Sequence, residues 1–136
     1  MKLVNFEVTS SVELYGLGEV WDLHNCVDFA GLKLVPEERA AILRWEVIAA
    51  EKPGPWGFSQ TNPAQSCSIR FDEVTSILVS PVTGGEGGAA EARTLEALAV
   101  IGSRVQFVFM AGFNIQVDAD RATLDSDGRV ETEPKP

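Results

Sequence analysis

The sequence predicts a mainly β protein: an antiparallel β-sandwich or partly closed barrel of about eight or nine short strands, with at most one or two short helical segments. Two observations carry this prediction. Apolar and polar residues alternate with the two-residue period of a half-buried strand in many short segments, which glycine, proline or aspartate separates. Strands and helices do not alternate along the chain, which argues against a parallel nucleotide-binding sheet.

The chain has the length of one domain. Its 136 residues are enough to bury a hydrophobic core without disulfides or a bound metal. We predict a single β-rich domain over residues 1–124 and a flexible C-terminal tail over residues 125–136, because the sequence turns polar at Asp125. No internal repeat or domain linker interrupts the pattern.

The first half of the chain begins with two short alternating segments and a glycine turn, and two longer extended segments follow. Pro36 and the two acidic residues after it predict one helical turn between the longer segments. The segment Ala40–Ala50 fits a strand or a helix, but Leu43, Trp45 and Val47 alternate with charged residues, which favours a strand. The predicted elements of this half are strands at 3–8 and 12–15, a turn at Gly16-Leu17-Gly18, a strand at 21–29 that extends to Val35, and a strand at 41–49.

The second half contains the clearest β pattern. Residues 104–109 and 113–117 alternate regularly on either side of Met110-Ala111-Gly112, which predicts a β-hairpin. The segment Thr94–Ile101 fits either a short helix or a buried strand, and the sequence leaves both open. The other predicted elements are strands at 67–71, 74–79 and 121–124, a bulge or turn at Asp72-Glu73, a loop at 52–66, and a glycine-rich loop at 82–92.

The charge balance limits the classes of molecule that the protein can be expected to bind. Twenty acidic and eleven basic residues give a formal net charge of −9. The basic residues are scattered along the sequence, whereas binding to nucleic acid or to a membrane surface needs clusters of lysine and arginine, so we expect neither partner. An acidic field speeds encounter with a basic protein; the alternative is that the charge serves solubility alone. The chain shows no signal peptide and no apolar run long enough to span a membrane, so we expect a cytoplasmic location.

One segment gathers most of the reactive side-chain types. A strand over Trp21–Phe29 would place a polar set on one face, because successive side chains point to opposite faces. This set is a candidate site for binding a ligand or partner, and the alternative is a solvated strand face without chemistry. The absence of a second histidine and of a Cys-x-x-Cys pair disfavours a structural zinc site, and we assign no catalytic residue, metal or cofactor. The set consists of Asp22, His24, Cys26 and Asp28.

Two aromatic residues in the predicted 52–66 loop form a second candidate. Trp56 and Phe58 would anchor a partner or a ligand if they are exposed. The alternative is that they plug one end of the sandwich, because tryptophan is highly buried on average. Cys26 and Cys67 are too few for a disulfide framework, and the sequence leaves open whether they pair.

Three stretches carry a family resemblance: Leu23-His24-Asn25-Cys26, Ile69-Arg70-Phe71-Asp72-Glu73-Val74-Thr75-Ser76-Ile77, and Ala111-Gly112-Phe113-Asn114-Ile115. Their order resembles a group of small bacterial β-rich proteins, some of which are proposed immunity proteins of polymorphic toxin systems. The resemblance covers Trp21 to Val117 and implies strands and turns rather than a site. Such proteins usually have Asp after the histidine, where this chain has Asn25. No functional residue is transferred.

These observations favour a protein that acts by binding, in the form of an immunity-type inhibitor of a basic toxin domain. One alternative is a small-ligand-binding protein or minor enzyme that uses an open end of the sandwich near His24 and Cys26. Another is a structural subunit of a homodimer, in which exposed sheet edges or the hairpin at 104–117 pair across a two-fold axis.

Overall fold

The fold is a mainly β, sandwich-like arrangement, as the alternation of apolar and polar residues predicted. The structure is a computed structural model that describes residues 1–47, 66–80 and 92–127. Two 3₁₀ turns, η1 (Pro36–Glu38) and η2 (Met110–Gly112), join strands. The strands are β1 (Lys2–Leu3), β2 (Phe6–Val8), β3 (Glu13–Gly16), β4 (Glu19–Asp22), β5 (Val27–Val35), β6 (Ala40–Val47), β7 (Ser66–Asp72), β8 (Ser76–Ser80), β9 (Leu95–Ile101), β10 (Arg104–Phe109), β11 (Asn114–Asp118) and β12 (Arg121–Asp127).

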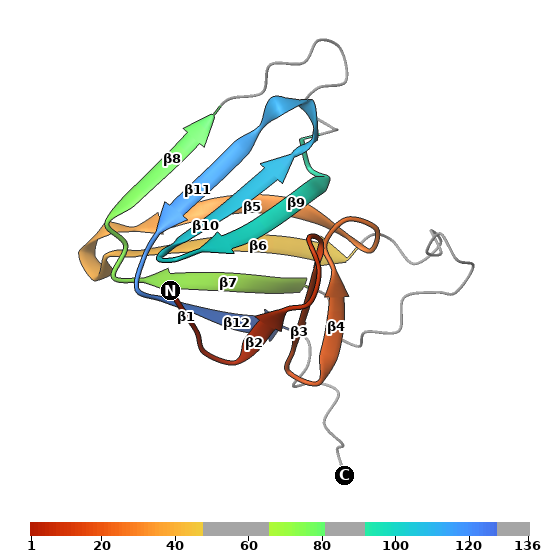
Figure 1. The fold of residues 1–136 in the computed structure, drawn as a ribbon, viewed down its shortest axis with the longest axis horizontal. Helices are drawn as coiled ribbons and strands as arrows, with labels where there is room; N and C mark the ends of the chain where they lie inside the picture. The colour runs from red at the N-terminus through yellow and green to blue at the C-terminus, as the bar shows by residue number, and fades with distance from the viewer. Residues whose placement is uncertain (48–65, 81–91, 128–136) are drawn as a thin grey trace.

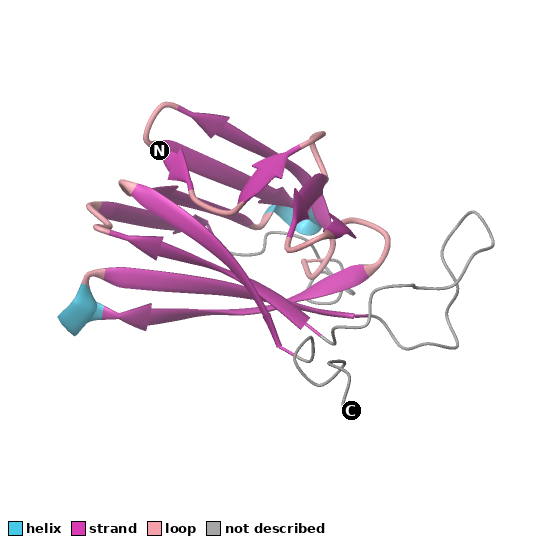
Figure 2. Ribbon diagram, turned by 90° about the horizontal axis from the view of Figure 1, so that it is seen from below, coloured by secondary structure: helices cyan, strands magenta, loops and turns pink. Residues whose placement is uncertain are grey.

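The strands of the described residues form three sheets. A five-stranded sheet has the order β1-β12-β7-β6-β5, a four-stranded sheet has the order β8-β11-β10-β9, and a small sheet has the order β2-β3-β4. Figure 1 shows the four-stranded sheet crossing the five-stranded sheet diagonally, and Figure 2 shows the two as separate layers. The small sheet lies at one end, beside the ends of β7 and β12 (Figure 1). Neighbouring strands are antiparallel in every described pair except β1 and β12, which are parallel.

Aromatic side chains from both large sheets fill the space between the layers. Phe107 of β10 is fully buried, and its ring centroid lies 5.7 Å from that of Trp45 and 6.2 Å from that of Phe71. The ring centroid of Phe29 in β5 lies 4.8 Å from that of Phe109 in β10. Because large aromatic side chains contribute most of the buried apolar area, this cluster is the main hydrophobic contact between the sheets.

The small sheet closes one end of this core. Leu14 and Trp21 point inward from β3 and β4 and are fully buried. Side chains of β2 line an apolar cavity of about 10 Å³ together with residues of both large sheets, which is about the space of one water molecule. The backbone N–H of Leu98 donates to the carbonyl of Ser11 at 2.7 Å, which ties β9 to the segment between β2 and β3.

The glycine turn between β3 and β4 is confirmed. Leu17 and Gly18 both have positive φ, 57° and 76°, as the two central residues of a type I′ hairpin turn require. Tight two-residue turns of this kind match the twist of antiparallel strands, so the turn sets the pairing of Tyr15 with Val20.

The predicted strand at 3–8 is split in two. β1 pairs with β12, whereas β2 pairs with β3. Asn5 lies at the break, and its side-chain amide replaces a backbone peptide: Nδ2 donates to the carbonyl of Leu124, and Oδ1 accepts from the N–H of Leu124, each at 2.8 Å. The side chain therefore continues the β1–β12 ladder while the backbone turns away.

Both segments that fitted a strand or a helix are strands, β6 at Ala40–Val47 and β9 at Leu95–Ile101. The interruption at Asp72-Glu73 is a turn that carries the chain from the five-stranded to the four-stranded sheet, with Glu73 at φ 58°. The tail prediction is wrong for residues 125–127, because β12 continues to Asp127 opposite β7. The loop was predicted at 52–66, but Ser66 is the first residue of β7. The rest of that loop, 52–65 with Trp56 and Phe58, and residues 82–91 of the predicted glycine-rich loop lie outside the described residues.

Candidate functional site

The predicted strand over Trp21–Phe29 is wrong. β4 ends at Asp22, residues 23–26 form a turn, and β5 begins at Val27. The polar set of Asp22, His24, Cys26 and Asp28 therefore does not share one strand face. The apolar residue Leu23 is fully buried although it lies in the turn, which is why the alternation continues through it.

The side chain of Asp22 is the physical reason for the turn. Its Oδ1 accepts from the backbone N–H of His24 at 3.0 Å and from that of Asn25 at 2.9 Å, and its Oδ2 accepts from Asn25 Nδ2 at 3.0 Å. The backbone N–H of Cys26 donates to the carbonyl of Asp22 at 3.1 Å. Aspartate competes in this way with strand pairing and favours turns.

His24 is a bridge between two parts of the fold. Its Nδ1 lies 2.7 Å from the carbonyl oxygen of Leu95, at the start of β9. A carbonyl only accepts, so the Nδ1–H group of His24 is the donor in this contact. The ring thereby holds the β4–β5 turn against the four-stranded sheet.

Cys26 is partly buried in the same turn, whereas Asp28 lies outside the turn, on β5. Burial raises the pKa of the Cys26 thiol, and the charge of Asp22 raises that pKa further. The thiol is therefore protonated at neutral pH, which disfavours a role as a nucleophile. Asp28 lies on β5, opposite Glu46 of β6. Cys26 and Cys67 are both thiols, so no disulfide joins them.

Three of the four predicted site residues, Asp22, His24 and Cys26, lie in or beside this turn. The hydrogen bonds of Asp22 and His24 hold the turn in place. Within the described parts of the chain, no three His, Cys, Asp or Glu side chains are grouped so that they could hold a metal ion. The hydrogen bonds of Asp22 and His24 support a role in fixing the turn.

Replacement of Asp22 by alanine is expected to lower the free energy of unfolding by about 1–2 kcal/mol, because the N–H groups of His24 and Asn25 lose their acceptor. Urea denaturation followed by tryptophan fluorescence measures the change. Asp28→Ala is the matched control, because Asp28 caps no turn, and it is expected to change stability by less than about 0.5 kcal/mol. Equal effects of the two changes would contradict the capping role.

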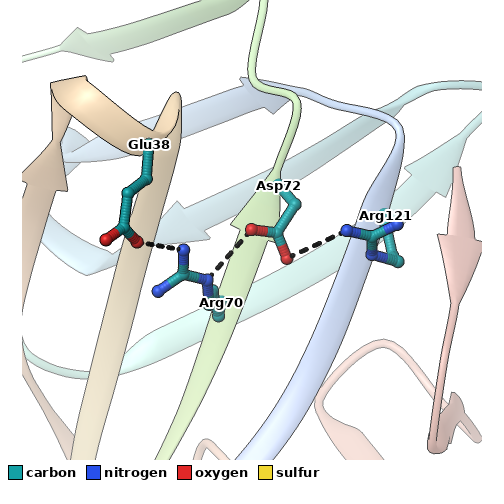
Figure 3. Close-up of polar contacts among 4 residues, drawn as sticks. All are labelled: Glu38, Arg70, Asp72 and Arg121. Atoms are coloured by element: carbon teal, nitrogen blue, oxygen red, sulfur yellow. Dashed lines mark hydrogen bonds and ion pairs between the residues drawn. The ribbon is translucent and has the colours of Figure 1, made fainter.

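The outer face of the five-stranded sheet carries a chain of ion pairs. Arg70 Nη2 lies 2.6 Å from Glu38 Oε1, and Arg70 Nε lies 3.0 Å from Asp72 Oδ1. Arg121 Nη2 lies 3.7 Å from Asp72 Oδ2, so the chain crosses from η1 over β7 to β12 (Figure 3). The hydrogen bonds that Arg70 donates to Glu38 and Asp72 raise the pKa of Arg70. These groups are partly exposed, so each pair stabilises the fold only slightly.

Strand pairing gathers basic residues that are scattered in the sequence. The basic side chains on this outer face alternate with acidic ones, so the face is close to neutral. Its basic residues are Lys2, Lys33, Arg44, Arg70 and Arg121, five of the eleven in the chain. Its acidic residues include Asp28, Glu46, Asp72 and Asp125.

Unlike the outer face of the five-stranded sheet, the outward face of the small sheet carries acidic residues and no basic ones. We call it the acidic face, and it consists of Glu7, Glu13, Tyr15, Val20 and Asp22. Glu7, Tyr15 and Val20 form one row across β2, β3 and β4. Tyr15 is 44% exposed and Val20 is 52% exposed. Glu13 and Asp22 lie directly opposite each other in the next row. An exposed aromatic and aliphatic pair therefore lies among carboxylates.

The sequence contains a signal for this face that alternation alone does not reveal. Residues 3–32 include five acidic residues and no lysine or arginine. The acidic face lies within this segment, so no basic side chain of its own strands compensates its carboxylates. The predicted site residue Asp22 belongs to both the turn and the acidic face, while Trp56 and Phe58 lie outside the described residues.

Comparisons with known proteins give a limited result. The chain matches no known protein family. It also matches no curated protein. It is similar to a solved structure described as the crystal structure of an uncharacterized protein from Neisseria gonorrhoeae, with 10% sequence identity and a TM-score of 0.45, over 75% of this chain and 91% of the other. Within residues 1–47, 66–80 and 92–127, no helix has the length and apolar character needed to cross a membrane.

Proposed function

We propose that the protein acts by binding a basic protein partner through the acidic face, in the manner of an immunity-type inhibitor of a basic toxin domain. The observation that carries the proposal is the row Glu7, Tyr15 and Val20, in which exposed apolar side chains lie beside a carboxylate in a segment without basic residues. Neither the outer face of the five-stranded sheet, with its chain of ion pairs, nor the turn at residues 23–26 offers such a combination.

The composition of the acidic face suits a protein interface. Tyrosine is enriched among the residues that dominate binding energy, because it buries a large area at low entropic cost and keeps a polar group for hydrogen bonding. Carboxylates around an apolar centre attract a partner of opposite charge and speed its encounter. The net charge of −9 acts in the same direction over a longer range.

The facing carboxylates of Glu13 and Asp22 give a second reason. Like charges directly opposite each other on two paired strands destabilise the sheet. A lysine or arginine from a partner would relieve this repulsion, so part of the cost in the unbound protein is recovered on binding. The Asp22 carboxylate keeps its hydrogen bonds to the turn in either state.

Binding to a candidate basic toxin domain, measured by calorimetry, tests the proposal. Tyr15→Ala is expected to weaken binding about 30-fold, as expected for loss of about 2 kcal/mol at an interface centre. Glu7→Gln is expected to slow association and to reduce its salt dependence. Leu34→Ala is the control, because Leu34 is 55% exposed on β5 and lies outside the acidic face.

Hen lysozyme, a basic protein of unrelated fold, separates specific recognition from general charge attraction. Specific binding predicts that lysozyme binds far more weakly than the toxin domain and that Tyr15→Ala does not change its binding. Equal binding of both proteins, or unchanged toxin binding by Tyr15→Ala, would overturn the proposal.

We also propose a cytoplasmic location. Free thiols at Cys26 and Cys67 are compatible with this location, because the cytoplasm keeps cysteines reduced.

A further inference from the structure

β8 forms one edge of the four-stranded sheet. β8 pairs with β11 over all five of its residues, Ser76 to Ser80, without a register shift. Among residues 1–47, 66–80 and 92–127, no strand pairs with its other side. The residues of β8 are serine and aliphatic only, and Leu78 is 59% and Val79 47% exposed. Exposed apolar edges of this kind readily pair with another strand.

The outer strands at the other ends of the two large sheets carry the protections that β8 lacks. β1 is only two residues long, and one of them is Lys2. β5 contains a register shift between Phe29 and Gly31 and carries Asp28 and Lys33. β9 carries Glu96, and its pairing shifts between Val108 and Phe109 of β10. Short length, charges and bulges are the usual means by which sheet edges avoid pairing.

The sequence of β8 is complementary to itself. Antiparallel pairing of two copies about Leu78 places Leu78 opposite Leu78, Ile77 opposite Val79, and Ser76 opposite Ser80. Each pair joins side chains of the same kind, and cross-strand pairs of β-branched and aliphatic residues stabilise sheets. The two-fold symmetry of such a pair is that of the commonest protein dimers.

We propose that β8 is a homodimer interface, through which two copies of the chain join their four-stranded sheets edge to edge across a two-fold axis at Leu78. Val79 supports this arrangement because it points to the inner side of its sheet, as its partner Ile115 does, yet it is 47% exposed. In the dimer, Ile77 of the second copy covers it. Leu78 and its counterpart cover each other on the outer side.

The absence of charged side chains on β8 lets a second copy approach this edge. Two chains of net charge −9 repel each other, so contact between them requires a surface without acidic residues. β11, the neighbour of β8, presents Asn114, Gln116 and Asp118 on the outer side. Arg104 donates to both carboxylate oxygens of Asp118, at 2.8 and 3.2 Å, and these hydrogen bonds lower the pKa of Asp118. This ion pair neutralises the one acidic side chain of β11.

Light scattering after size-exclusion chromatography tests the dimer with the full chain at about 0.1 mM, where even a weak interface is populated. The wild type is expected at twice the chain mass of 14.7 kDa. Leu78→Lys is expected to be a folded monomer, because the dimer would place two lysines opposite each other. Ile101→Lys is the matched control: Ile101 is 60% exposed on β9, the other edge of the same sheet, and this variant is expected to remain dimeric.

A disulfide provides a second readout that does not depend on loss of binding. Opposite residues of antiparallel strands lie about 4.5–5.5 Å apart at Cα, within the range that a disulfide spans. In a Cys26→Ser background, Leu78→Cys is expected to form a covalent dimer under mild oxidation, and Ile101→Cys is expected to remain monomeric on a denaturing gel.

Salt distinguishes this interface from the acidic face. Screening weakens repulsion between two acidic chains, so dimerisation is expected to strengthen as salt rises, whereas binding to a basic partner is expected to weaken. A monomeric wild type at about 0.1 mM in high salt, or a Leu78→Lys variant that is still dimeric, would overturn the dimer and leave the proposed function untouched. Equal disulfide yields at positions 78 and 101 would also overturn it.

Discussion

Truncation of Phe107 to alanine is expected to lower the free energy of unfolding by about 4 kcal/mol. Phe107 is fully buried, and its ring lies within 6.5 Å of the rings of Trp45, Phe71 and Phe109. Its removal opens a cavity between the two large sheets, and the surrounding rings come from different strands that cannot easily collapse into it.

Chemical denaturation of the variant and the wild type measures this change, with Phe107→Leu as an intermediate case that is expected to cost about 1–1.5 kcal/mol. Tyr15→Ala is the matched control, since it removes an aromatic side chain that is 44% exposed and is expected to change stability by less than about 0.5 kcal/mol. The same control shows that the variant used in the binding experiment is folded. A loss below about 2 kcal/mol for Phe107→Ala would contradict the central place of this ring.

Replacement of Gly16 by alanine is expected to cost about 2–3 kcal/mol, although it adds only one methyl group. A Cβ atom at Gly16 would lie 2.6 Å from Phe6 Cβ and 2.8 Å from the carbonyl oxygen of Asn5. It would also lie 2.8 Å from Leu124 Cδ2. Two of these three neighbours, Phe6 Cβ of β2 and the carbonyl oxygen of Asn5, are rigid parts of the chain, so β3 would have to move away from β2 within the small sheet to make room.

Gly102→Ala separates this steric cost from the cost of backbone conformation. Gly102 has φ +62°, and a Cβ there would meet nothing within 4 Å, so its replacement is expected to cost about 1 kcal/mol through conformation alone. The two variants are compared by denaturation. A Gly16→Ala variant as stable as Gly102→Ala would show that the small sheet yields more readily than its close packing indicates.

Much of the fold was predictable because the alternation of apolar residues reports which side chains face the core. The β10–β11 hairpin shows this most clearly: Phe107 and Ile115 are fully buried partners, as alternation on either side of a glycine turn predicted. The segment that became β9 stayed ambiguous, because its alanine and leucine residues favour helices and only its pairing with β10 makes it a strand.

The candidate site was less predictable, for two physical reasons. Alternation continued through Leu23 because this side chain is buried from a turn, while the hydrogen bonds of Asp22 that end β4 leave no trace in periodicity. The acidic face depends on register: Tyr15 meets Val20 through a local hairpin, but Glu7 joins them only when β2 docks on β3. The depletion of basic residues in 3–32 is the feature that a charge analysis along the sequence would have detected.

The position of β12 has a consequence for how the protein is made. β12 lies between β1 and β7, so the strand that the ribosome delivers after all others described fills a gap between two earlier ones. Until it emerges, β1 has no partner, the Asn5 amide has no peptide to bind, and one edge of β7 is bare. Contacts this distant in sequence form slowly, because the intervening loop entropy must be overcome first. A nascent chain in which β12 has not yet been synthesised is therefore the form most exposed to aggregation and most in need of a chaperone.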